Sequence, residues 1–347
     1  MSMLVNSHIS SGKKVKIVVI GTGGTIAGSL LTADLNNNEQ DYIPAQLSIK
    51  KLISKLAFDS SIEIISEQIA QIDSKDISES VWLRLAQCVN EHLLCEDVNG
   101  IVITHGTDTL EETAVFLERV LAPSKPVVLT AAMRPADAVD ADGPQNLRDA
   151  VAVAASNQWN GVLVVLNNTV WNGVAVRKLH PWETHAFATI PMEPLGSVNH
   201  GNLHFQRTCL GFKDAVYAPW GWGDPIGVDA LPKDLMLWPW VEIISSYGGC
   251  SEKAFEQLIV AGVKGIIFSA TGNGTLHERL IEAAQNAVAK KLIDTSRLWV
   301  ATRCIAGGLS KTTAYGFRTA GPLTPTQARV MLMLEIIAQH HAYGHCG

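Results

Sequence analysis

Two glycine-rich segments carry hydroxyl and carboxyl groups with the spacing of a reactive or ligand-binding site. The first, residues 21–28, reads Gly-Thr-Gly-Gly-Thr-Ile-Ala-Gly and directly follows an apolar run. Its glycines permit positive φ and let a ligand approach the main chain beside the hydroxyls of Thr22 and Thr25. The pattern is neither GxGxxG nor the GxxxxGK of a P-loop, so a nucleotide site is poorly supported. The hydroxyls either face a ligand at the carboxyl end of a strand or cap the following helix.

The second segment, residues 104–113, reads Thr-His-Gly-Thr-Asp-Thr-Leu-Glu-Glu-Thr after another apolar run. Main-chain N–H groups at the start of the helix expected here would favour an anion or a developing oxyanion. Thr109 and Glu112 fit a capping box, which is a purely structural role. A cap does not account for Thr107 and Asp108, so these two side chains are candidates for chemistry. Two such segments in one sheet predict one shared cleft.

Short apolar runs rich in Val and Ile alternate along the chain with amphipathic stretches of helical length. The apolar runs predict strands at 16–20, 62–65, 100–104, 126–130, 162–167, 241–245, 265–269 and 298–302. The amphipathic stretches predict helices at 79–94, 109–121, 145–156, 251–260, 276–291 and 326–339. This alternation is typical of an α/β fold with mostly parallel sheets flanked by helices. Both glycine-rich segments then follow strands.

The chain is long enough for two domains, because 347 residues at about 150 residues per domain correspond to roughly two. Residues 209–240 lose the strand–helix pattern and are rich in Gly, Pro and Trp, which predicts a linker. We therefore expect a larger N-terminal domain at 1–208 and a smaller, flavodoxin- or Rossmann-like C-terminal domain at 241–347. Four tryptophans in the linker indicate that it packs, either against a domain or against another subunit.

Composition and charge exclude several classes of protein. With 47% hydrophobic and 17% charged residues, the chain is unlike disordered or fibrous proteins. A net charge of -6 without a Lys/Arg block argues against nucleic acid as a partner. No run of about 18 apolar residues predicts a membrane span. Residues 17–20 form an apolar run too short for a signal peptide and suit a buried strand, so we expect a cytoplasmic protein.

Cysteines and histidines show no recognisable metal-binding spacing. The six cysteines lack CxxC or Cys/His zinc patterns and are expected to be reduced, mostly buried thiols. Cys88 and Cys95 lie on the 79–94 helix and at its end, and we interpret both as core thiols. His105 is expected to be a hydrogen-bonding residue under its turn rather than a general base. A solvated tail explains the C-terminal histidines better than a metal site does, namely His340, His341 and His345.

The chain resembles the bacterial-type L-asparaginase and glutaminase-asparaginase family, whose members are amidohydrolases with threonine nucleophiles. The two glycine-rich segments carry this resemblance. Further matches support it at 132–135, 142–147, 164–167 and 271–274. The resemblance extends over residues 15–340, and the lack of a signal peptide makes the chain most similar to the cytoplasmic, type I-like branch.

The resemblance implies a threonine acyl-enzyme mechanism. Thr25 matches the threonine that attacks the side-chain amide, and Tyr42 matches the tyrosine that hydrogen-bonds it. Thr107, Asp108 and Lys178 match a second, triad-like set in which the lysine lowers the cost of removing the threonine proton. Amide hydrolysis needs a nucleophile, a proton acceptor, an oxyanion stabiliser and a proton donor to ammonia. These side chains and nearby main-chain N–H groups supply such parts, so no cofactor or metal is expected.

The same resemblance implies how an amino acid would be held. Asp73, Ser74 and Lys75 match the loop that holds the α-carboxylate and α-amino groups. Asp108 would also hold the α-ammonium, and the Ala132 carbonyl would take the substrate amide. Many relatives with a secretory signal carry Gln or Glu at the position of Lys75. A cation there would repel the substrate ammonium, so either Lys75 turns outward or the ammonium site differs.

Two further positions bear on assembly and function. Relatives of the periplasmic kind borrow a Glu from a neighbouring subunit, and Leu309 stands at that position here, while Thr275 matches another subunit-crossing position. We expect a homo-oligomer, a dimer or a tetramer, because relatives assemble. The implied activity is hydrolysis of L-asparagine to L-aspartate and ammonia, with glutamine as a minor substrate. Two alternatives remain, a different amide preference and an amino-acid sensor on an inactive amidase scaffold.

Overall fold

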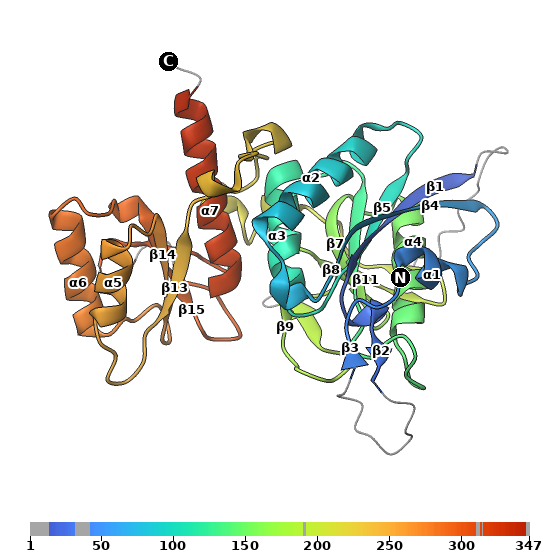
Figure 1. The fold of residues 1–347 in the computed structure, drawn as a ribbon, viewed down its shortest axis with the longest axis horizontal. Coiled ribbons are helices and arrows are strands. Elements are labelled where there is room, and N and C mark those ends of the chain that lie inside the picture. Colours follow the sequence, from blue (N-terminus) through green and yellow to red (C-terminus); the bar gives the residue numbers. More distant parts are fainter. Residues whose placement is uncertain (1–13, 32–41, 190–191, 310–312, 314, 345–347) are drawn as a thin grey trace. The chain divides into compact units, whose positions relative to one another are not determined.

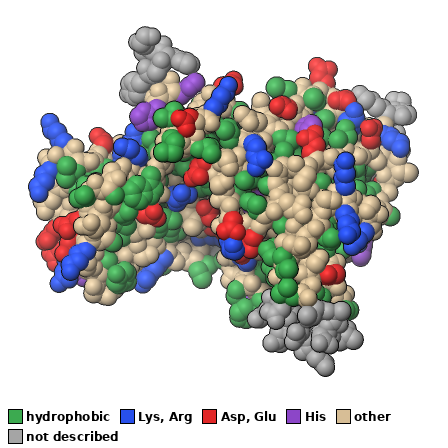
Figure 2. Space-filling model, in the orientation of Figure 1, with side chains coloured by type: hydrophobic (Ala, Val, Ile, Leu, Met, Phe, Trp, Pro, Cys, Tyr) green, Lys and Arg blue, Asp and Glu red, His purple; other side chains and the backbone are tan. Residues whose placement is uncertain are grey.

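The computed structural model describes residues 14–31, 42–189, 192–309, 313 and 315–344 (Figure 1). The chain divides into two compact units, the second of which begins at Phe212. Over the described ranges, no helix has the length and apolar character needed to cross a membrane. On the face shown in Figure 2, acidic and basic side chains are interspersed in both units.

The first unit is built on an eight-stranded mixed sheet in the order β12-β11-β8-β7-β6-β5-β1-β4. Strands β4, β1, β5, β6 and β7 run parallel, and the remaining pairs are antiparallel. The strand bounds are β1 Val15–Gly23, β4 Ile62–Ile72, β5 Gly100–Thr104, β6 Pro126–Thr130, β7 Gly161–Leu166, β8 Thr169–Asn172, β11 Gly196–Asn199 and β12 Asn202–Phe205. The predicted α/β class is confirmed, and β8, β11 and β12 add an antiparallel edge.

Helices cover both faces of this sheet, which explains why its central strands are continuous Val/Ile runs. Helices α1 (Ile49–Ser54) and α4 (Gly143–Ser156) pack on one face, and α2 (Glu79–Leu94) and α3 (Leu110–Leu121) pack on the other (Figure 1). Two small antiparallel ribbons stand beside the sheet. They are formed by β2 (Ser29–Leu30) with β3 (Tyr42–Ile43), and by β9 (Val176–Lys178) with β10 (Phe187–Thr189).

The second unit contains a four-stranded parallel sheet in the order β13-β14-β15-β16. Its elements are β13 Val241–Ser245, α5 Lys253–Val260, β14 Gly265–Ala270, α6 Glu278–Ala289, β15 Leu298–Thr302, β16 Arg318–Thr319 and α7 Pro325–Gly344. Leu309 is buried in the core of this unit. Thr275 hydrogen-bonds Thr271 across a tight turn. His340 and His341 lie near the end of α7, and His345 lies outside the described residues.

The Trp-rich segment 209–240 belongs almost entirely to the second unit and forms short 3-10 turns rather than strands or α-helices. Trp222 is buried and stacks on Trp299 of β15, with ring centroids 6.0 Å apart. The Arg318 guanidinium lies 4.3 Å from the centroid of the Trp299 ring, on which it makes a cation–π contact. Trp222 therefore packs against its own domain.

The expectation of buried cysteines holds for part of the set. Cys88, Cys209 and Cys250 are buried, whereas Cys95 and Cys304 are exposed, and none of these five forms a disulfide. Cys346 lies outside the described residues. The interpretation of Cys95 as a core thiol was wrong. It stands in the extended C-cap position of α2, beyond the helical face that packs on the sheet.

Candidate active site

The two glycine-rich segments meet at one edge of the sheet because β1 and β5 are parallel neighbours, with Gly21 opposite Thr104. The carboxyl ends of the two strands consequently open on the same cavity, of about 530 Å³. Ligand pockets usually measure about 300–1,000 Å³. The lining residues are Thr25, Tyr42, Asp73, Ser74, Thr107, Asp108, Met133, Arg134, Lys178, Pro181 and Trp182. The single cleft predicted from the two segments is confirmed.

Thr25 and Tyr42 form a hydroxyl pair on one side of the cavity. Thr25 lies in a 3-10 turn immediately after β1 and is 8% exposed. Its Oγ1 atom is 2.7 Å from the Tyr42 hydroxyl. Tyr42 is held by the ribbon in which it pairs with Leu30, and a Cβ atom at Gly28 would lie 2.9 Å from the Tyr42 ring. Gly28 therefore leaves room for the tyrosine beside the threonine.

Lys178, Thr107 and Asp108 form a second polar group. The Lys178 ammonium donates to Thr107 Oγ1 at 2.8 Å and to Asp108 Oδ1 at 2.6 Å. Lys178 lies at the end of β9, and its main-chain N–H donates to the Glu111 carboxylate at 3.0 Å. Its side chain is 18% exposed against 56% for Asp108. The ion pair is therefore half open to a polar ligand entering the cavity.

The segment after β4 closes a third side of the cavity. Asp73 and Ser74 line it, and Thr109 Oγ1 donates to the Ser74 carbonyl at 2.8 Å. The predicted capping box at Thr109 was wrong, since its side chain makes no cap to α3 and its backbone is not extended. Lys75 turns outward, where its 61% exposed side chain pairs with Asp76. It does not line the cavity.

The loop after β6 forms another wall of the cavity. Ala132 is fully buried and does not line the cavity, whereas Met133 and Arg134 do. Their main-chain N–H groups donate to the Asp142 carboxylate at 3.0 and 2.9 Å, and Asn146 donates to that carboxylate at 3.1 Å. Burial raises the pKa of Asp142, against the opposing effect of these hydrogen bonds. Asp142 thus fixes the main chain of Met133 and Arg134 in this loop.

Sequence reasoning missed four lining residues. Met133 and Arg134 fall within the 132–135 match, which could have indicated them. Pro181 and Trp182 follow Lys178 in an irregular loop and carried no signal of their own. Pro181 and Trp182 reach the cavity because they closely follow Lys178, which lies at the end of β9 beside it.

Thr22 has a structural role, although its hydroxyl was a candidate ligand group. It is buried and donates to the Thr104 carbonyl at 2.9 Å. This bond ties the end of β1 to the end of β5. Thr25 alone of the two threonines in the first segment lines the cavity.

Comparison with known proteins agrees with this geometry. The N-terminal asparaginase family pattern matches residues 16–210, and that of the glutaminase/asparaginase C-terminal domain matches residues 240–341. The chain belongs to the asparaginase family. It is 35% identical to L-asparaginase 2 of Escherichia coli K12 over 92% of this chain and 88% of that relative. It is also 35% identical to a glutaminase-asparaginase of Pseudomonas fluorescens biotype A, over 93% and 87% of the two chains.

A solved structure in the asparaginase family shares the fold. The crystal structure of a probable cytoplasmic L-asparaginase from Campylobacter jejuni superposes with a TM-score of 0.81 at 33% identity. The match covers 95% of this chain and 99% of that one. Both units described above therefore have counterparts in an asparaginase of known structure.

Glycines let the three loops of this asparaginase site approach one another. A Cβ atom at Gly24, whose φ is 79°, would lie 2.5 Å from the Gly106 Cα atom. A Cβ atom at Gly106 would lie 2.4 Å from the Ser74 hydroxyl oxygen and 2.7 Å from its Cβ atom. No side chain larger than hydrogen fits at either position. The close approach of these loops brings Thr25, Thr107 and Ser74 to one cavity.

Gly106→Ala should lower the free energy of unfolding by about 1–3 kcal/mol, because the added methyl group is forced into a packed loop. Gly248→Ala is the matched control, since nothing lies within 4 Å of its added Cβ and its φ is not positive. We expect that control to stay within about 0.5 kcal/mol of the native chain. Urea unfolding measures both variants. Equal stabilities would show that the loops can part without cost.

His105 supports the turn of the second segment, as expected. It is buried, with Nδ1 2.7 Å from the Gly106 carbonyl and Nε2 3.0 Å from Thr113 Oγ1. Burial lowers the pKa of His105 from 6.5 to about 4, against a smaller opposing effect of the Gly106 carbonyl. The ring is therefore neutral at pH 7 and fixes the main chain next to Thr107.

The lowered pKa of His105 should make the protein acid-sensitive. Between pH 6.5 and pH 4 the unfolded chain binds a proton at this histidine that the folded chain does not. The free energy of unfolding should therefore fall with decreasing pH in this window, by up to about 3 kcal/mol from this group. Urea unfolding at several pH values should give a shallower slope for His105→Gln. The slope should be unchanged for His204→Gln, a control at an exposed position. Equal slopes in all three proteins would contradict this account.

Proposed function

We propose that this protein hydrolyses L-asparagine to L-aspartate and ammonia through an acyl-enzyme on Thr25. The observation that carries the proposal is that the Thr25–Tyr42 pair and the Lys178–Thr107–Asp108 group line one cavity. Membership of the asparaginase family and relatives named L-asparaginase support the same substrate.

In the proposed reaction, Thr25 Oγ1 attacks the side-chain amide carbon and a C–O bond forms, while the Thr25 proton passes by way of the Tyr42 hydroxyl to the amide nitrogen and the C–N bond then breaks. Ammonia leaves with the proton it needs, and water then hydrolyses the ester and restores the Thr25 hydroxyl. Tyr42, 2.7 Å from Thr25, orients the nucleophile and shares its proton. The Lys178 ammonium stabilises negative charge on the Thr107 oxygen, which lowers the cost of removing the Thr107 proton.

Recognition of the amino acid follows from the charges around the cavity. The Asp108 carboxylate is half exposed and faces the cavity, where it can bind the substrate's α-ammonium. Ser74 lies on the neighbouring loop after β4, and its hydroxyl is a donor for the α-carboxylate. Glutamine differs from asparagine by one methylene, a difference worth only about 1–3 kcal/mol in a pocket. Relatives named glutaminase-asparaginase make glutamine the second substrate to test.

The deciding experiment is ammonia release from L-asparagine, L-glutamine and D-asparagine by the purified chain. We expect the highest kcat/KM with L-asparagine and a smaller one with L-glutamine. Ammonia release from none of the three would contradict the proposal. If L-asparagine then still raised the melting temperature by binding the folded state, the chain would be an amino-acid sensor.

Lys75→Gln should leave KM for L-asparagine within about twofold of the native value, because an exposed ion pair contributes little and this ammonium lies outside the cavity. Steady-state kinetics at constant ionic strength test this. A fall in KM of tenfold or more would mean that Lys75 turns inward and repels the substrate ammonium.

We further propose that the protein works in the cytoplasm as a homo-oligomer. The solved relative titled a probable cytoplasmic L-asparaginase supports this location, whereas a relative from Haemophilus influenzae is named periplasmic. Cell fractionation tests the location, and light scattering on the purified chain tests the assembly.

A further inference from the structure

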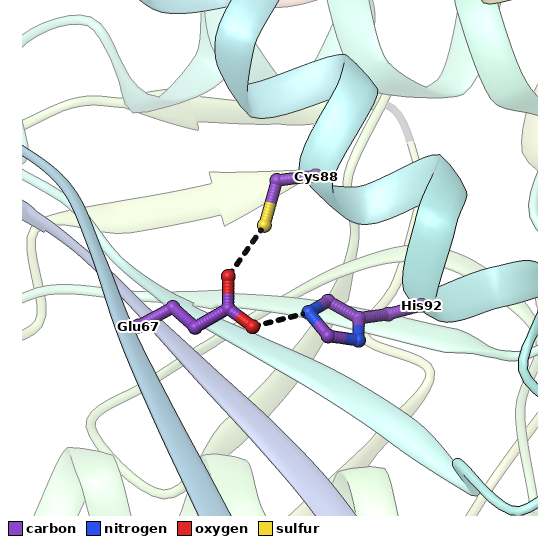
Figure 3. A group of neighbouring side chains, drawn as sticks. All are labelled: Glu67, Cys88 and His92. Atoms are coloured by element: carbon purple, nitrogen blue, oxygen red, sulfur yellow. Dashed lines mark hydrogen bonds and ion pairs between the residues drawn. The ribbon is translucent and has the colours of Figure 1, made fainter.

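A polar cluster outside the asparaginase cavity joins strand β4 to helix α2. Its members are Glu67, Cys88 and His92 (Figure 3). The Cys88 sulfur lies 3.3 Å from Glu67 Oε2, and His92 Nε2 lies 2.8 Å from Glu67 Oε1. One ligand atom from each residue lies within 4.8 Å of the other two. The three side chains therefore converge on a single point.

The fold holds these side chains together. Cys88 and His92 are four residues apart on α2 and so lie on one face of the helix. Glu67 projects from β4 toward α2, whereas its neighbour Gln68 bonds Ile49 of α1 on the other face of the sheet. The alternation of side chains along a strand thus places Glu67 opposite the Cys88–His92 face.

We propose that Glu67, Cys88 and His92 bind a zinc ion, with water as the fourth ligand. Thiolate, imidazole and carboxylate together suit zinc rather than magnesium or calcium, which prefer oxygen ligands alone. Bond lengths of zinc to sulfur, nitrogen and oxygen imply ligand–ligand separations of roughly 3.4–3.6 Å in a tetrahedron. Cys88 Sγ and His92 Nε2 lie 3.3 and 2.8 Å from different Glu67 oxygens, and the ligand atoms all lie within 4.8 Å of one another. Side-chain rotations that bring one Glu67 oxygen, the sulfur and the nitrogen to a common distance would complete the tetrahedron.

The charges of the three ligands and their exposure to solvent agree with a zinc site. A Cys88 thiolate and the Glu67 carboxylate together balance a dication, and a neutral His92 completes the set. Cys88 is buried, but the Glu67 side chain is 40% exposed and that of His92 is 17% exposed. An ion can therefore enter from solvent and keep a water ligand on its open side. Binding replaces the Cys88 thiol proton, which is released, and removes the Cys88–Glu67 hydrogen bond.

The proposed zinc ion would join strand β4 to helix α2, the two elements on either side of a loop that lines the asparaginase cavity. Residues 73–78, which include Ser74, connect β4 directly to α2. A metal bound by one ligand from β4 and two from α2 holds the elements on either side of this loop together. Zinc should therefore raise the melting temperature, because only the folded chain brings all three ligands together and so binds the ion more tightly than the unfolded chain does.

Cobalt(II) titration of the untagged, metal-free chain tests the proposal. A cobalt–thiolate bond gives a near-ultraviolet charge-transfer absorption that carboxylate and imidazole ligands do not produce. We expect this absorption to saturate at one cobalt per chain and to be displaced by zinc. Loss of a residue that merely hydrogen-bonds a metal ligand weakens metal binding by about 10–100-fold. Replacement of a ligand itself should cost more, so Glu67→Gln and His92→Gln should weaken cobalt binding by at least about 100-fold.

Two serine variants show which cysteine provides the thiolate that binds cobalt. Cys88→Ser should abolish the absorption, whereas Cys95→Ser, at the exposed cysteine after the end of α2, should retain it. Unchanged ammonia release and circular dichroism show that each variant is folded. Absence of the absorption in the native chain would overturn the proposal without any variant. Its persistence in Cys88→Ser, or its loss in Cys95→Ser, would also overturn it.

Discussion

Thr25→Ala should lower kcat for L-asparagine by about 10⁴–10⁶-fold, because removal of a nucleophile leaves only binding and oxyanion stabilisation. The fold should persist, since alanine keeps the backbone of the turn and removes the hydroxyl that faces Tyr42 at the cavity. Ammonia release measures the loss. The rise in melting temperature with L-asparagine should remain, which separates binding from chemistry.

Thr25→Ser is the matched control for this variant. It keeps the hydroxyl beside Tyr42 and removes only a methyl group, so it should retain measurable turnover. Turnover at the native rate in Thr25→Ala, with an unchanged melting temperature, would remove Thr25 from the mechanism. Acyl-enzyme trapped in Thr25→Ala by acid quench would place the nucleophile elsewhere.

Lys178→Met should lower kcat by about 10²–10⁴-fold, the usual contribution of one proton-transfer group. Methionine keeps much of the length of the side chain but removes the ammonium that donates to Thr107 and Asp108. Asp108 is 56% exposed and stays hydrated, so the loss should fall on turnover rather than on folding. Lys75→Met serves as the control, since its ammonium points away from the cavity and turnover should be nearly unchanged.

A double-mutant cycle shows whether Lys178 acts through Thr107. If the two form one unit, Thr107→Ala combined with Lys178→Met should be no slower than the worse single variant. Additive losses would show instead that Lys178 and Thr107 act in separate steps. The single variant Asp108→Asn would test whether Asp108 mainly binds substrate, because KM should then change more than kcat.

Tertiary contacts decided the roles of several residues that sequence patterns misplaced. Thr109 follows the capping-box spacing, yet its hydroxyl bonds the Ser74 carbonyl of a loop 35 positions away in the chain. Thr22 stands among the glycines, yet it bonds the Thr104 carbonyl inside the sheet. In both cases a partner from a distant segment replaced the local one. Lys75 differs from these two, because its ammonium turns outward to pair with its sequence neighbour Asp76.

The sequence by itself determined the α/β class and the strands that precede both glycine-rich segments. Through family resemblance it also predicted Thr25, Tyr42, Thr107, Asp108 and Lys178 as site residues, and these five line one cavity. Those signals are local, since strand runs, turn glycines and short motifs are set by neighbouring residues. The convergence of these side chains depends on the sheet order, in which β1 lies between β4 and β5. Only the tertiary structure decided that order, because pairing between strands and the direction of each side chain depend on contacts between segments far apart in the chain. The Glu67–Cys88–His92 cluster also depends on tertiary structure, because Cys88 and His92 share one face of α2 but Glu67 comes from strand β4.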